Sequence, residues 1–88
     1  MTTLTLSTSL EKLDGNPGSD WHGAEFGGVT VQIDMASRVA EVHVSSPDAT
    51  PEEIIKAREV LADCGLGFPG QFTASQTDPD VILYSARF

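Results

Sequence analysis

The stretch VTVQIDMASRVAEVHV, residues 29–44, decides the fold. On both sides of a short centre, apolar residues alternate with others at the period of two that half-buried strands show. With Ala36 and Ser37 as the turn, the two runs pair as a hairpin that has one uniformly apolar face. That face pairs Ile33 with Ala40, Val31 with Val42 and Val29 with Val44, and the opposite face pairs Gln32 with Glu41 and Thr30 with His43. Ala-Ser lacks the Asn-Gly signature of a two-residue turn, so a longer loop remains open.

A helix follows the hairpin, and three signals mark its start. Thr50 is a capping residue, Pro51 suits the first helical position, and Glu53 stands at the capping-box spacing from Thr50. We expect the helix over residues 51–64, with Gly65 ending it in the left-handed conformation. Its inward face holds Ile54, Ala57, Val60, Leu61 and Cys64. Its outward face holds Glu52, Glu59 and Asp63 beside Lys56.

The remaining segments predict more strands and one long loop. Residues 2–9 alternate Thr and Ser with Leu4 and Leu6, which predicts a strand with one buried face. Residues 14–28 hold five glycines and one proline, so we expect a long glycine-rich loop pinned by Trp21 and Phe26. Residues 71–75 predict a short strand, residues 77–80 a turn, and residues 81–88 a central strand with apolar groups on both faces.

These elements predict one α+β domain over residues 1–88. We expect an antiparallel or mixed sheet of four to five strands with one helix packed on one face, in the order β-ββ-α-β-β. A chain of 88 residues has room for a single core. A β-grasp arrangement shares the hairpin, the helix and the later strands, but no motif fixes it.

The chain is strongly acidic, with 13 Asp and Glu residues against five Lys and Arg residues and a net charge of -8. Such a chain repels nucleic acid and anionic membranes and attracts basic surfaces. Its apolar stretches fall far short of the ~20 residues that span a bilayer, and no signal-peptide pattern is present. We therefore expect a cytoplasmic protein, located in the host cell cytoplasm if a phage encodes it, that contacts neither nucleic acid nor membrane directly.

Few residues suggest catalysis or metal binding. Asp20, His22 and Glu25 lie close together in the glycine-rich loop, where a carboxylate can orient an imidazole as a general base, yet no nucleophile stands at a recognised spacing. The glycines do not form a phosphate-binding loop. We expect Cys64 to be a buried, inert thiol, and with His22 and His43 it supplies too few ligands for a zinc site. We expect no enzymatic activity, no cofactor and no metal.

The acidic helix face motivates the leading functional hypothesis. Carboxylates in a row reproduce part of the charge pattern of nucleic acid, so such a face fits a basic groove that normally tracks a phosphate backbone. In its size, its acidity and its lack of catalytic motifs, the chain resembles the small inhibitors that phages carry against host defence, notably anti-CRISPR proteins. The resemblance implies a stoichiometric inhibitor of a CRISPR-type complex. The predicted partner-binding residues are Glu52, Glu59, Asp63, Glu41, Trp21, Asp20 and Glu25.

Two other functions remain open. The chain is alternatively a self-associating structural or virion protein, in which the edge of the C-terminal strand and the loop aromatics make a homodimer that depends on Tyr84 or Phe88. A second alternative is a small ligand-binding or catalytic module that uses residues 20–25, in which His22 is essential.

Overall fold

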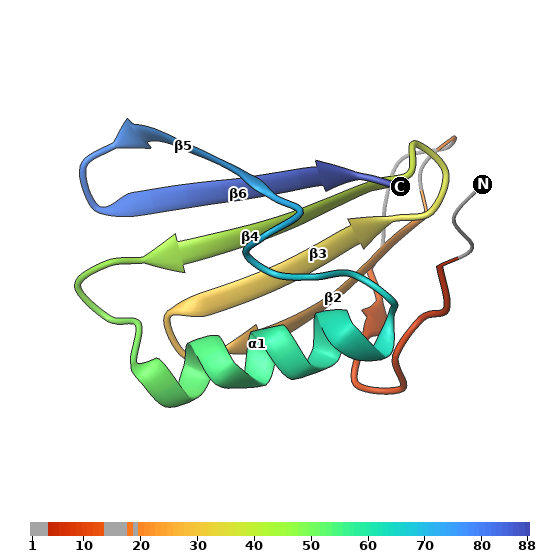
Figure 1. Cartoon of the computed structure of the whole chain (residues 1–88), viewed down its shortest axis with the longest axis horizontal. Coiled ribbons are helices and arrows are strands. Elements are labelled where there is room, and N and C mark those ends of the chain that lie inside the picture. Colours follow the sequence, from red (N-terminus) through yellow and green to blue (C-terminus); the bar gives the residue numbers. More distant parts are fainter. Residues whose placement is uncertain (1–3, 14–17, 19) are drawn as a thin grey trace.

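The described part of the chain folds into one six-stranded sheet with a helix on one of its faces (Figure 1). The computed structural model describes residues 4–13, 18 and 20–88. The elements are β1 Glu11–Lys12, β2 Trp21–Phe26, β3 Val29–Asp34, β4 Val39–Ser45, α1 Pro51–Asp63, β5 Thr73–Asp78 and β6 Val81–Arg87. The sheet order is β1-β2-β3-β4-β6-β5, and every neighbouring pair is antiparallel. The predicted α+β class is confirmed, with more strands than the four to five expected.

The register of the β3–β4 hairpin is the predicted one. Pairing runs from Val29 opposite Val44 to Asp34 opposite Val39, and it includes all five predicted pairs. The connection is longer than two residues, because residues 35–38 form the turn. Arg38 takes a φ of 60° there. The alternating burial of the two strands sets the register, although the turn residues carry no strong signal.

The helix begins and ends as its sequence signals predict. The Thr50 side chain accepts a hydrogen bond from the Glu53 backbone N–H, and the Glu53 side chain accepts one from the Thr50 backbone N–H, which completes the capping box. At the other end Gly65 has a φ of 92°. The Leu66 N–H donates to the Leu61 carbonyl at 2.8 Å, and this closes a Schellman motif.

The core lies between α1 and one face of the sheet. Burial alternates along β3 and β4, so that α1 covers one face while the other face stays open. The chain segment after α1 crosses the covered face (Figure 1). There the Phe68 ring packs edge-on against Tyr84, with the ring centroids 5.0 Å apart. The largest fully buried side chains are Ile33, Leu61, Val29, Val31, Val42 and Cys64.

The predicted strand over residues 2–9 is wrong for its described part, residues 4–9, and residues 2–3 lie outside the described residues. Leu4 and Leu10 are buried in the core, and the Ser7 N–H donates to the Cys64 Sγ at 3.4 Å. This segment therefore buries Leu4 and Leu10 in the core and meets the C-terminal end of α1 at Cys64, and it does not pair with the sheet. Only the next two residues, Glu11 and Lys12, pair with the sheet, as β1.

The predicted long loop over residues 14–28 is also wrong in part. Residues 21–26 form β2, which pairs with β3 along its whole length, and residues 27–28 make the tight turn between the two strands. Residues 14–17 and 19 lie outside the described residues. The glycine content favours a loop, but pairing with β3 stabilises the segment as a strand, because tertiary context overrides local preference in sheets.

The C-terminal strand is an inner strand, as predicted. β6 pairs with β4 on one side and with β5 on the other. The expectation that this strand offers a free edge for self-association is therefore wrong. The edge strand on this side of the sheet is β5, which begins and ends later than the predicted strand over residues 71–75.

Candidate partner-binding surface

The outward side of α1 carries the acidic residues predicted for it. Glu52, Glu59 and Asp63 are all exposed. By helix geometry they span about 16 Å along the axis and fall within about 40° of one another around it. Within the described part of the chain, no Lys or Arg nitrogen lies within 4.0 Å of these three carboxylates, although Lys56 lies on the same side. We call these three residues the helix stripe.

Glu53, the neighbouring carboxylate, has a structural role instead. Its Oε1 accepts from the backbone N–H of Thr50 at 2.9 Å and from that of Gly28 at 3.3 Å. The hydrogen bond from Thr50, followed by that from Gly28, holds the pKa of Glu53 below its ordinary value. One side chain thus caps α1 and ties its first turn to the β2–β3 turn, and this sets where the helix stripe lies relative to the sheet.

The open face of the sheet holds three of the other predicted residues. Side chains alternate between faces along a strand, so Trp21, Glu25 and Glu41 project on the side that α1 does not cover. Trp21 is half-buried and Glu25 is exposed. The Glu41 carboxylate lies 3.7 Å from Nε2 of His43, its neighbour on the same face. His43 stands opposite Thr30, as predicted.

The structure therefore divides the predicted partner-binding residues between two surfaces. The helix stripe faces away from the sheet on one side, and Trp21, Glu25 and Glu41 lie on the open face on the other. Asp20 stands just before β2, at the end of the sheet where β3 finishes. A single partner surface would have to reach around the molecule to contact all of them.

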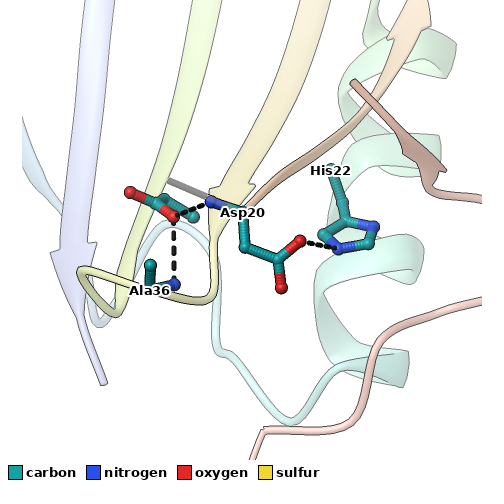
Figure 2. Close-up of polar contacts among 4 residues, drawn as sticks. Asp20, His22 and Ala36 are labelled. Atoms are coloured by element: carbon teal, nitrogen blue, oxygen red, sulfur yellow. Dashed lines mark hydrogen bonds and ion pairs between the residues drawn. The ribbon is translucent and has the colours of Figure 1, made fainter. Parts of the chain in front are cut away.

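Asp20 and His22 do come together, as Figure 2 shows. The His22 Nε2 lies 3.1 Å from the Asp20 Oδ1, and the His22 side chain is 15% exposed. Glu25 does not join them. It follows His22 by three residues along β2, and because side chains alternate between faces, it lies on the opposite face of the sheet. The arrangement is a carboxylate-oriented imidazole on the covered face of the sheet. Of the predicted catalytic trio, only two members share a surface.

Asp34 organises the same end of the sheet and is not among the residues predicted for a site. Its Oδ1 accepts from the backbone N–H groups of Asp20 at 2.9 Å and Ala36 at 3.0 Å (Figure 2). Its Oδ2 accepts from the Ser37 hydroxyl at 2.6 Å. The bond from Ser37, then that from Asp20, holds the pKa of Asp34 below its ordinary value. The donors Ala36 and Ser37 follow Asp34 by two and three residues, and this spacing is typical of an Asx turn.

The residues proposed for self-association have partners within the chain. Tyr84 packs against Phe68 on the covered face. The Arg38 guanidinium lies 5.4 Å from the centroid of the Phe88 ring, and the Arg38 Nε donates to the Phe88 carbonyl at 2.6 Å. These contacts fasten the end of the chain to the β3–β4 turn.

Sequence reasoning missed a groove on the open face beside β1. It has a volume of about 460 Å³, and its lining includes Glu11, Leu13, Gly23, Glu25 and Gln32. Gly23 falls within the predicted loop, so its place in the lining of a groove could not be predicted. The alternation of Trp21, Gly23 and Glu25 with His22, Ala24 and Phe26 is the one local signal for a strand here.

Two other classes of site can be assessed on the described residues. No helix among them has the length and apolar character needed to cross a membrane. Within residues 4–13, 18 and 20–88, no group of three or more His, Cys, Asp and Glu side chains is placed to hold a metal ion. Comparison with models of known families, with curated proteins and with solved structures finds no match for this chain.

Proposed function

We propose that this chain is a non-enzymatic binding protein that uses the helix stripe to occupy a basic, nucleic-acid-binding surface of another protein. One observation carries the proposal: Glu52, Glu59 and Asp63 are exposed in a row on one helix and have no cationic partner among the described residues. Because α1 is capped and fastened to the sheet, the stripe is presented on a rigid element, and little backbone conformational entropy is lost when a partner binds it.

Two charges of the stripe, those of Glu59 and Asp63, run against what helix stability favours, whereas Glu52 lies in the first turn, where the helix dipole favours an anion. Glu59 and Asp63 are a like-charge pair four residues apart in the half of the helix where the dipole favours cations, and the last turn of α1 holds no basic residue. Each of these effects costs a few tenths of a kcal/mol. A binding role at a basic surface accounts for why the charges stand there.

In its specific form, the proposal is an inhibitor of a nucleic-acid-handling host defence complex of the CRISPR type. This form rests on the likeness in size and acidity to phage-encoded inhibitors. Carboxylates in a row compete for Lys and Arg side chains that would otherwise neutralise phosphates. The predicted behaviour is one-to-one occupancy of a groove, with no chemical turnover.

The test begins with capture of binding proteins from a host lysate at low salt, followed by competition with duplex DNA or RNA for the captured protein. We expect the captured protein to bind either nucleic acid or this chain but not both, and to release this chain as salt rises. A captured protein that holds nucleic acid and this chain at the same time would refute mimicry.

A matched pair of variants assigns the surface. Neutralising the stripe with Glu52→Gln, Glu59→Gln and Asp63→Asn should weaken binding. Neutralising three exposed carboxylates outside α1, Asp48→Asn, Asp78→Asn and Asp80→Asn, changes the net charge by the same amount. Equal weakening by both sets would show that net charge alone drives binding and would overturn the role of the stripe.

A further inference from the structure

The outer edge of β2 is only partly covered by β1. The two strands pair through Glu11 opposite Gly23 and Lys12 opposite His22, and the Leu13 N–H donates to the Trp21 carbonyl at 2.8 Å. In an antiparallel ladder the backbone groups of every second residue point to the same side. Trp21, Gly23 and therefore also Glu25 direct their N–H and C=O groups toward the β1 side.

No strand in the described part of the chain reaches Glu25 on that side. Before Glu11 the chain turns away, with the Leu10 N–H donating to the Ser7 carbonyl at 3.1 Å and Leu10 buried in the core. The Glu25 backbone is thus an open position on the sheet edge, continuous with the β1 pairing. Such an edge is a template for an added strand.

The groove of about 460 Å³ lies beside this open edge. Gly23 is among its lining residues, and Leu13 packs closely over it, because an added Cβ at Gly23 would lie 3.0 Å from the Leu13 Cδ1 and 2.9 Å from the Val31 carbonyl oxygen. Leu13 is 37% exposed and forms an apolar wall. The groove therefore combines an unpaired backbone edge with room for a side chain and an apolar surface to hold its stem.

The charged groups of the groove are both acidic. Glu11 and Glu25 line it, both are exposed, and neither has a Lys or Arg nitrogen within 4.0 Å among the described residues. Lys12, next to Glu11, projects to the opposite face because side chains alternate along β1. Charge complementarity therefore selects a basic side chain for this position.

We propose that the groove receives an extended segment of a basic partner protein, which adds as a strand at Glu25 and places a Lys or Arg side chain between Glu11 and Glu25. In strand addition, main-chain hydrogen bonds supply affinity and pockets for alternate side chains supply specificity. The inference takes only the basic character of the partner from the proposed function. It assigns that partner a second point of contact, on the opposite side of the sheet from the helix stripe.

The probe is a capped pentapeptide, Thr-Val-Arg-Val-Thr, and its matched control has Glu in place of Arg. Titration is followed by the backbone amide signals of the full chain in NMR spectra and by amide hydrogen exchange. We expect the Arg peptide to shift residues 11–13 and 23–26 and to slow exchange at the Glu25 N–H, while the Glu peptide leaves them unchanged. Shifts at the β5 edge, shifts on α1, or no shifts would each overturn the proposal.

Two charge-matched variants separate the groove from the helix stripe. Glu11→Gln with Glu25→Gln should lower the affinity for the Arg peptide about tenfold, which is the loss expected when two exposed ion pairs of about 0.7 kcal/mol each are removed. Glu52→Gln with Glu59→Gln should leave its affinity within about twofold. Equal weakening by both variants contradicts the groove. If the Arg peptide does not bind at the groove while a captured basic protein still requires the helix stripe for binding, this inference is refuted and the proposed function stands.

Discussion

Replacing Gly28 with Ala should push α1 away from the sheet. An added Cβ would lie 2.6 Å from the backbone nitrogen of Ala49 and 2.7 Å from the carbonyl carbon of Asp48. Both are backbone atoms. Two hydrogen bonds hold this segment in place: the Ser45 N–H donates to the Gly28 carbonyl at 2.8 Å, and the Ala49 N–H donates to the Ser45 carbonyl at 2.8 Å. The clash cannot be relieved by rotating a side chain, so the segment leading into α1 must move.

The expected cost follows from overpacking. Forcing a methyl group into a filled site costs about 1–3 kcal/mol. For a domain of this size, 1 kcal/mol lowers the unfolding midpoint by roughly 4–8 °C, so about 2 kcal/mol lowers it by roughly 8–16 °C. The same movement should disturb the hydrogen bond between the Gly28 N–H and Glu53, and with it the position of the helix stripe.

Two other glycines provide controls. Gly70 has nothing within 4 Å of an added Cβ, and Gly70→Ala should be neutral or stabilising by up to about 1 kcal/mol. Gly65 also faces open space but has a φ of 92°, so Gly65→Ala should cost about 1–2 kcal/mol through backbone conformation alone. Thermal and urea unfolding of the three variants measure the order of their stabilities. If Gly28→Ala is as stable as Gly70→Ala, the close approach of the segment leading into α1 to the β2–β3 turn is refuted.

Two further predictions concern ionisable groups. Burial, the main effect, raises the pKa of the Cys64 thiol. The folded protein should therefore react with an aromatic disulfide reagent only as fast as it opens, whereas protein unfolded in urea should react at once. Immediate labelling of the folded protein would contradict this prediction. Hydrogen bonds hold the pKa of Asp34 below its ordinary value of 3.8. Its stabilising effect is therefore complete above about pH 5, and it is lost progressively as the pH falls below that and through the lower folded value. Asp34→Asn should therefore make the acid loss of stability shallower, and an equally steep loss would refute the role of this carboxylate.

The parts of the fold that the sequence predicts are those whose signals are local. The capping box at Thr50 and Glu53 and the left-handed Gly65 fix α1 within a few residues, and the helix stripe follows from helical geometry alone. The hairpin register follows because both of its strands are buried on the same face. Each of these features can be read from about 15 contiguous residues.

The parts that the sequence does not predict depend on distant contacts. β2 is a strand because it pairs with β3, and the glycines at 23, 27 and 28 give a stronger local signal for a turn. The groove exists because residues 4–10 leave the sheet to pack against the end of α1, where Ser7 meets Cys64, more than 50 positions along the chain. No local pattern encodes that choice, so Glu11 and Leu13 could not be recognised as lining residues.

The two acidic surfaces constrain how one partner binds. The helix stripe lies on the covered side of the sheet and the groove opens on the other, in a molecule that measures at least 22 Å in every dimension. At physiological salt the screening length is about 8 Å, so the charges of one surface scarcely act on a partner at the other. A partner with a flat basic surface can contact only one of the two acidic surfaces, so its affinity would fall on neutralisation of one set of carboxylates only. A partner that contacts both must place a groove over α1 and an extended arm along β2, and the free-energy losses from the two sets of variants would then add. A loss of affinity from both sets of variants, rather than from one, therefore distinguishes a wrapped partner from a flat one, whichever protein the partner is.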